Sequence, residues 1–233
     1  MLNTLHEVLI FLEDKGRVSL PEFKGWKSRQ VRGALGRLER EKWVRKERKN
    51  GTIFYELSAR GQQEIDRTLS FLRTHEVSWD GVWRLVMFDI PEKERDLRDK
   101  FRRGLMGLNL KNLQGSVWVS SKDVRKEVKQ LAEEVGVSSE RLNIFTARAE
   151  NDRNVAASWD LTALNKDYKQ FVKRVDTLLA NKRTPQSYEV KKIIFDYALI
   201  RRHDPNLPES LLPVDWAEGE AHDAYQRLRR VIT

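Results

Sequence analysis

The chain has 233 residues, with no cysteine, four histidines and 44 Lys and Arg against 35 Asp and Glu, a formal charge of +9. The lack of cysteine excludes disulfides and thiolate metal sites and is typical of the reducing cytoplasm. Apolar runs such as LIFL are far shorter than the ~20 residues that span a bilayer, and residues 1–12 lack the basic start of a signal peptide. We therefore expect a cytoplasmic protein of two or three domains, with no membrane partner and no histidine-rich metal centre.

Nearly the whole excess of positive charge lies in one stretch near the N-terminus. Between Lys24 and Lys49 there are eleven Lys or Arg and three Glu, a local net charge of +8. A positive charge that is concentrated in this way favours an anionic partner such as nucleic acid.

The first residues of the chain show helical periodicity. The spacing of apolar side chains predicts a helix over residues 2–15, which Gly16 ends. We expect a short helix over 19–23, and a third helix that begins with Ser28 as its N-cap and stops near Trp43.

Two strand-like runs, VRKERK and TIFYEL, follow and are joined by Asn50-Gly51. This is a strong hairpin signal, because both turn residues need a positive φ. Ser58 can then cap a helix that runs to about Arg73. Three helices and a hairpin within about 60 residues, together with the basic stretch, predict a winged helix-turn-helix DNA-binding domain over residues 1–75.

A second domain is predicted over residues 76–150, entered through a linker at 75–81. The sequence predicts six elements in the order strand, helix, strand, strand, helix, strand. These elements cover residues 83–89, 93–108, 110–114, 116–120, 122–135 and 141–147. The order βαββαβ is that of the ferredoxin-like fold, and we interpret this domain as the one that dimerises.

Helical periodicity dominates the rest of the chain. After a polar connection over 148–158, a long helix begins behind its cap Asp160. Further helices are predicted over 189–202 and about 218–231, separated by a loop rich in proline. We expect residues 151–233 to form a small helical region for packing or effector binding, which makes the whole chain an α+β protein.

The third predicted helix and the hairpin supply the candidate DNA contacts. In a helix-turn-helix the second helix of the motif enters the major groove, where arginine suits guanine and glutamine suits adenine. Base contacts are therefore expected from Arg29, Gln30 and Arg32, and phosphate contacts from the start of the helix and from the hairpin. The predicted DNA-contacting residues are Lys27, Ser28, Arg29, Gln30, Arg32, Arg37, Arg45, Lys46, Arg48 and Lys49.

An alternative interpretation of this segment is a solvated basic face on a small helical domain. Gly33 and Gly36 bear on the choice, because each costs about 1 kcal/mol relative to alanine inside a helix. They permit a close approach either to DNA or to the first helix, and the sequence leaves both open.

Three segments, in this order along the chain, resemble the PaaX-like repressor family. WDGVWRLVMFDIPEKERDLRDKFRRGLMGLNLKNLQGSVWVSS is similar to its middle domain, and SWDLTALNKDYKQF and DPNLPESLLPVDWAEGEAHDAYQRL are similar to its C-terminal region. The resemblance implies a homodimeric repressor, not an enzyme and without a cofactor or catalytic residues, that binds an inverted-repeat operator in double-stranded DNA. It also implies release by a small effector, which is an acyl-CoA in the founding members. This chain is shorter than typical members, and the difference lies in the C-terminal region.

The middle segment also resembles the small CRISPR adaptation nuclease that scaffolds spacer integration. That family has an aspartate at the end of its first strand, and Asp89 matches its position. The alternative function is therefore a Mg²⁺-dependent nuclease or a CRISPR adaptation scaffold, with Asp89 as a metal ligand. One carboxylate per chain supplies few of the oxygen ligands that Mg²⁺ needs, and no nearby strand end offers a second acid. The structural interpretation has Asp89 accepting backbone N–H groups or pairing with an arginine.

Four residues of the C-terminal region are candidates for effector binding. Trp159 and Trp216 flank the predicted helices, while Arg201 and Arg202 form a basic spot before the proline-rich loop. The alternative is that the tryptophans are buried in the core and that the arginines are solvated cations at a helix end, favoured by its dipole.

Overall fold

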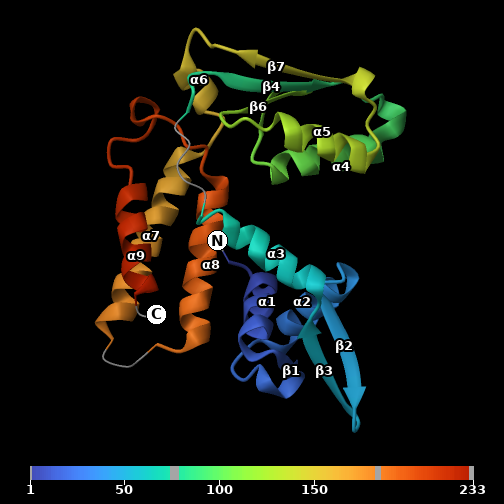
Figure 1. Ribbon diagram of the computed structural model, residues 1–233, viewed down its shortest axis with the longest axis vertical. Helices are drawn as coiled ribbons and strands as arrows, with labels where there is room; N and C mark the ends of the chain where they lie inside the picture. The colour runs from blue at the N-terminus through green and yellow to red at the C-terminus, as the bar shows by residue number, and fades with distance from the viewer. Residues whose placement is uncertain (1, 74–78, 182–184, 231–233) are drawn as a thin grey trace. The chain divides into compact units, whose positions relative to one another are not determined.

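The structure, a computed structural model, describes residues 2–73, 79–181 and 185–230 (Figure 1). The chain forms two compact units. Unit 1 comprises Met1–Thr74, Lys166–Arg202 and Ala217–Thr233, and unit 2 comprises His75–Asn165 and His203–Trp216. The predicted C-terminal region 151–233 is thus divided between the units. The mixed α+β class is confirmed, and the boundary predicted after residue 75 lies outside the described residues.

The N-terminal part of unit 1 combines three helices with a small antiparallel sheet. The helices are α1 (Thr4–Lys15), α2 (Ser28–Arg40) and α3 (Ala59–Ser70). The strands are β1 (Arg17–Ser19), β2 (Val44–Lys49) and β3 (Thr52–Leu57), in the order β1-β3-β2. The short helix expected over residues 19–23 is a single 3₁₀ turn, η1 (Leu20–Glu22). The Glu22 carboxylate accepts the Ser19 backbone N–H, so the capping interaction spans just this one turn.

Local caps and turns explain where these elements end. Gly16 (φ 76°) ends α1, and Asn50 and Gly51 (φ 50° and 79°) form the predicted hairpin turn between β2 and β3. Ser58 caps α3 as predicted, since its Oγ accepts the Gly61 N–H at 3.1 Å. The prediction that Ser28 is an N-cap was wrong by one residue. Lys27 is already extended (ψ 105°), and its carbonyl accepts the first helical bonds.

A hydrophobic core in unit 1 combines residues of the N-terminal elements with two residues of a C-terminal helix. Leu9 and Leu12 of α1 and Leu35 and Leu38 of α2 are almost completely buried. Two side chains of α8 (Ser187–His203), Phe195 and Leu199, belong to the same core. The other C-terminal helices are α7 (Leu161–Ala180) and α9 (Glu218–Arg229).

A fully buried carboxylate, that of Asp196 in α8, fixes the start of the chain. It accepts the Leu2 backbone N–H at 2.9 Å and pairs with the Arg174 guanidinium. Lys191 adds an ion pair to Glu13 of α1 at 2.8 Å. A buried acid is tolerated only when hydrogen-bonded in this way, so the contact specifies how α1 meets α8.

Unit 2 contains a four-stranded antiparallel sheet with two helices on one face (Figure 1). Its strands are β4 (Trp83–Phe88), β5 (Lys111–Gln114), β6 (Val117–Ser120) and β7 (Leu142–Ala147), in the order β5-β6-β4-β7. Its helices are α4 (Arg95–Gly107), α5 (Arg125–Val135) and α6 (Asp152–Ala156), and its 3₁₀ turns are η2 (Glu92–Glu94), η3 (Ser139–Arg141) and η4 (Glu209–Leu211). Residues 148–158 were expected to be a polar connection. Instead they include α6, whose single turn has no periodicity to detect and is capped by Asn151.

The two faces of this sheet have different surroundings. Val86 and Phe88 point to the helix side and pack against Phe101 of α4. On the opposite face, Trp83 stacks on Trp159 with ring centroids 5.9 Å apart. Further along that face Met87 is 39% exposed, and Phe145, which pairs with Leu85, is 50% exposed. One end of this open face is therefore covered within unit 2 and the other presents apolar side chains to solvent.

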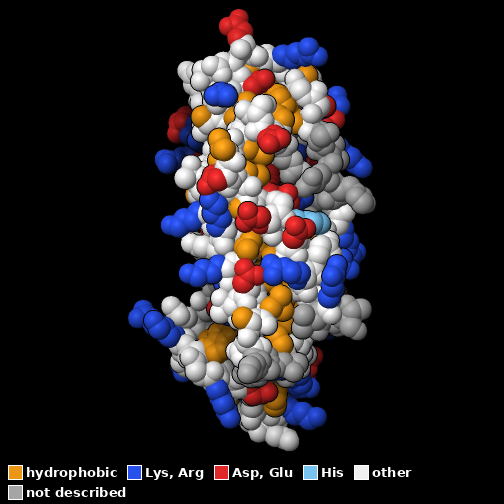
Figure 2. Space-filling view, turned by 90° about the vertical axis from the view of Figure 1, so that its left-hand side faces the viewer, with side chains coloured by type: hydrophobic (Ala, Val, Ile, Leu, Met, Phe, Trp, Pro, Cys, Tyr) orange, Lys and Arg blue, Asp and Glu red, His pale blue; other side chains and the backbone are white. Residues whose placement is uncertain are grey.

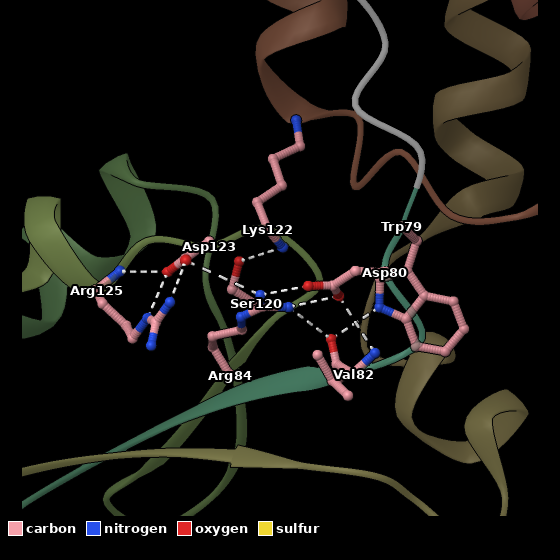
Figure 3. A network of polar contacts seen from close by, with 8 residues as sticks. All are labelled: Trp79, Asp80, Val82, Arg84, Ser120, Lys122, Asp123 and Arg125. Atoms are coloured by element: carbon pink, nitrogen blue, oxygen red, sulfur yellow. Dashed lines mark hydrogen bonds and ion pairs between the residues drawn. The ribbon is translucent and has the colours of Figure 1, made fainter.

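A network of polar contacts holds the entry into unit 2 (Figure 3). The buried Arg84 guanidinium binds both oxygens of Asp80, at 2.7 and 2.5 Å, while Trp79 donates its indole N–H to the Val82 carbonyl. At the start of α5, hydrogen bonding from Arg125 lowers the pKa of Asp123 to about 2. These contacts attach residues 79–82 to β4, so the network has a structural role.

Candidate nucleic-acid interface

Helix α2 separates apolar from basic side chains. Its buried side is formed by Val31, Ala34, Leu35 and Leu38. Its arginines are exposed, and no ion pair joins them to a described residue; these are Arg29, Arg32, Arg37 and Arg40. Burying the apolar side fixes the helix rotation, and the rotation directs all four cations outward.

The start of α2 offers a second group of exposed polar atoms. Lys27, Ser28 and Gln30 are exposed, and the first helical hydrogen bond is donated by Gln30 to the Lys27 carbonyl. No side chain caps this end, so the N–H groups before Gln30 lack the usual capping partner. Such an end suits a phosphate oxygen.

The β2–β3 hairpin extends the basic surface. Arg45, Arg48 and Lys49 are exposed, and no described acid pairs with them. Lys46 lies 3.7 Å from Glu39 of α2. All ten predicted DNA-contacting residues are thus exposed in unit 1, and Lys46 is the one whose charge has an acidic partner among the described residues.

The two units differ strongly in charge. Unit 1 contains 29 Lys and Arg and 17 Asp and Glu, whereas unit 2 contains 15 basic and 18 acidic residues. Within unit 1 the charge is also uneven. Basic and acidic side chains are interspersed on the face seen in Figure 2. Between α7 and α9 the cation of Arg227 is paired with Asp176 at 2.9 Å. A positive field therefore comes mainly from α2 and the hairpin.

Asp89 lies at the end of β4 and is exposed. Its backbone N–H donates to the Arg141 carbonyl at 3.0 Å, but its carboxylate makes no hydrogen bond or ion pair with a described residue. The neighbouring acids are engaged, Glu92 by Arg98 at 2.6 Å and Glu94 by Arg141 at 2.8 Å. Across the described ranges, His, Asp and Glu side chains form no cluster of three or more that could hold a metal ion. The structural interpretation expected the Asp89 carboxylate to accept backbone N–H groups or to pair with an arginine, and the described residues show neither contact.

The four candidate effector residues fall in different units. Trp159 and Trp216 belong to unit 2, where Trp159 is buried on Trp83 and Trp216 is half-buried. Arg201 and Arg202 belong to unit 1. Arg201 is buried against Glu218 at 2.5 Å, and burial lowers the pKa of Arg202. Neither unit contains all four residues.

Sequence reasoning missed two cavities in unit 1. One, of about 290 Å³, lies at the start of α2 and is also lined by Lys192 of α8. The other, of about 460 Å³, lies between α7 and α8. Periodicity shows which side of a helix is buried but not which helix covers it. The sequence therefore did not predict that Lys192 lies at the cavity beside α2.

Comparison with known proteins defines the class. The family model described as "PaaX protein central Cas2-like domain" matches residues 76–158, and the "PaaX-like protein C-terminal domain" matches residues 159–233. Together they cover more than half of the chain. The "Transcriptional repressor PaaX" of Escherichia coli (strain K12) is 29% identical over 229 residues, which are 90% of this chain and 72% of that protein. The chain belongs to the PaaX-like repressor family.

A solved structure supports the fold. The "Uncharacterized protein Rv0674 from Mycobacterium tuberculosis" matches with a TM-score of 0.54 and 20% identity, over 89% of this chain and 83% of that one. At this identity the likeness concerns the fold alone. In the described residues no helix combines the length and the apolar character needed to cross a bilayer.

Proposed function

We propose that this protein is a homodimeric transcriptional repressor that binds a double-stranded DNA operator through its N-terminal region. One observation carries the proposal: the exposed arginines of α2 and the cations of the adjoining hairpin, which almost all lack an acidic partner among the described residues. Cations left without a counter-charge on one small surface are what binding to a phosphate backbone requires. The family's named relative is itself a repressor.

The N-terminal region acts, in this proposal, as a winged helix-turn-helix. The order α1, η1, α2 and then a β-hairpin supports the assignment. Helix α2 is the recognition helix, and Arg29, Gln30 and Arg32 read bases because they are exposed near its N-terminal end. Lys27, Ser28 and the hairpin hold phosphates.

Unit 2 provides a ferredoxin-like dimerisation domain. The strand order β5-β6-β4-β7, with α4 and α5 on one face, supports this assignment. Its open face is proposed to meet a second copy of the chain. Five large apolar side chains are exposed in the described part of the chain, and three of them, Met87, Leu113 and Phe145, lie on strands of this sheet. Sedimentation should show a dimer that Phe145→Glu converts to a monomer, and a monomeric wild type would contradict the assignment.

The operator follows from the symmetry of the dimer. Two copies of α2 should read an inverted repeat whose half-sites lie about 34 Å apart, or a multiple of that distance. Sequencing the DNA recovered with the protein from its own genome tests this. We expect enriched sites with that symmetry, and log K that falls with log salt at a slope of roughly −0.9 per phosphate contact. Equal binding of duplex DNA and RNA, or binding indifferent to salt, would contradict the proposal.

The effector step and the cytoplasmic location remain predictions from the family and from composition. An acyl-CoA, titrated into a complex of the protein with its operator, should release the DNA. Each candidate effector residue (Trp159, Arg201, Arg202 and Trp216) is tested by its own alanine variant, which should keep operator affinity but lose this response. Unchanged release of DNA in all four variants would show that the effector binds at other residues.

A Mg²⁺-dependent nuclease is not favoured, because no cluster of three or more His, Asp or Glu occurs in the described residues and the acids next to Asp89, Glu92 and Glu94, are paired with arginines. Incubation with DNA or RNA in Mg²⁺ or Mn²⁺ should give no cleavage that Asp89→Asn removes. Metal-dependent cleavage lost in that variant would restore the alternative.

A further inference from the structure

The cavity of about 290 Å³ at the start of α2 combines residues from both ends of the chain. Lys27 and Gln30, two of the predicted DNA-contacting residues, line one side. Tyr188 and Lys192 of α8 and Thr4 and Glu7 of α1 also line the cavity. All of these residues belong to unit 1, so their arrangement is defined. The cavity therefore brings a lysine of the C-terminal region to the edge of the proposed DNA interface.

Aromatic packing holds this part of α8 against α1 and α2. The Tyr188 ring lies 5.2 Å from that of Phe11 and 6.1 Å from that of Trp26, measured between centroids. The ion pair between Lys191 and Glu13 holds the next turn of α8. Lys192 consequently projects from a fixed helix, and binding an anion costs little more than ordering its own side chain.

The charges in the cavity favour an anion. Lys27 and Lys192 supply two ammonium groups, Thr4 supplies a hydroxyl donor, and Glu7 is the one acid among the residues that line it. Lys192 lies 3.5 Å from the Glu7 carboxylate and is 36% exposed. This pair is long and solvated, so it is weak enough to be exchanged for a stronger partner.

We propose that this cavity seats a backbone phosphate of the bound DNA, and that Lys192 is a DNA contact contributed by the C-terminal region. The inference rests on the proposed function, because Lys27 and Gln30 place the cavity on the same surface as the recognition helix. Lys192 moves from Glu7 to the phosphate when DNA binds. The C-terminal helices then take part in DNA binding directly and do not merely support the basic domain.

Three variants of the full-length protein test the proposal by fluorescence anisotropy on operator and random duplexes. Lys192→Ala removes one phosphate contact, so the salt slope should become shallower by about 0.9, equally on both duplexes. The affinity ratio of wild type to variant should then shrink about 3.5-fold between 50 and 200 mM salt. Lys192→Arg should keep the slope. Glu7→Gln should bind both duplexes several-fold more tightly, because it frees Lys192 and removes a repulsive charge.

Lys166→Ala is the matched control, since this exposed α7 lysine lines neither cavity of unit 1 and its loss should leave the slope unchanged. An unchanged slope for Lys192→Ala, or weaker binding by Glu7→Gln in a folded variant, would overturn the inference. If Arg29→Ala with Arg32→Ala still weakens operator binding roughly 100-fold in that case, the proposed function survives without a phosphate contact from Lys192. Failure of the wild type to bind duplex DNA would instead reject the proposed function itself.

Discussion

Helices α2 and α4 are built from similar residues and are used differently. Each has 13 residues, several arginines and an internal glycine. In α4, Arg95 pairs with Asp99 at 3.8 Å, Arg98 pairs with Glu92 at 2.6 Å, and Arg102 lies over the Trp118 ring. The arginines of α2 have no such partners among the described residues. Arg103 of α4 is also exposed and has no acidic partner in the described ranges, so the difference is one of degree. All four arginines of α2 lack such a partner, and this supports the proposed interface on α2.

The glycines of the two helices give the same contrast. A Cβ added to Gly104 of α4 would lie 2.4 Å from the Leu131 side chain, so close packing of α4 on α5 requires glycine there. A Cβ added to Gly33 or Gly36 of α2 would meet no atom within 4 Å. Packing against α1 therefore does not explain them. The other interpretation, a close approach of DNA to α2, stays a prediction.

The largest expected effect is on operator binding. Arg29→Ala with Arg32→Ala should weaken it roughly 100-fold, because each bidentate base contact contributes about 1–3 kcal/mol of discrimination. Arg95→Ala with Arg98→Ala in α4 is the matched control and should change it little. Anisotropy titrations at constant salt measure both. Equal losses in the two double variants would remove the distinction between the helices.

Gly104→Ala tests the packing side of the comparison. The new methyl group must displace Leu131, and overpacking of this kind costs roughly 1–3 kcal/mol. Urea denaturation monitored by circular dichroism should show the loss in the free energy of unfolding. An unchanged urea midpoint would mean that the Leu131 side chain moves aside without a loss of stability.

Gly33→Ala should act in the opposite direction on stability. Replacing an exposed helical glycine with no neighbour should raise the free energy of unfolding by about 1 kcal/mol. Operator affinity should nevertheless fall, because the methyl group keeps the DNA away from α2. Gly219→Ala in α9, whose Cβ also meets no atom, should leave DNA binding unchanged. A more stable Gly33→Ala protein with full affinity would show that DNA does not approach this glycine.

The smallest effect concerns His6 of α1. Burial lowers its pKa from the usual 6.5, and the positive charges of the N-terminus, Arg202 and Arg37 add to this. The unfolded chain binds this proton more readily, so the contribution to stability is complete above the unfolded pKa and is lost as pH falls below it. Arg37→Ala should raise the His6 pKa in an NMR titration, and Arg95→Ala should not. If both variants titrate like the wild type, the charge of Arg37 does not affect the pKa of His6.

Local signals predicted local structure well. Asn50-Gly51 defined a hairpin because few other pairs tolerate two positive φ angles, and Asp160 caps α7 as expected, accepting the Ala163 N–H at 2.9 Å. The exposure of the α2 arginines followed from the apolar periodicity of the same helix. What the sequence could not give is long-range pairing. Lys192 lines the same cavity as the start of α2, and Asp196 accepts the Leu2 N–H, each across more than half the chain. Neither local sequence pattern indicates the distant partner.

The discontinuity of unit 1 has a consequence for synthesis on the ribosome. Helices α1 and α2 share their core with Phe195 and Leu199 of α8. This core can therefore be completed only after α8, which is made more than a hundred residues later, has been synthesised. At ordinary translation rates that interval is on the order of ten seconds. A nascent or prematurely terminated chain would lack the part of this core that Phe195 and Leu199 supply.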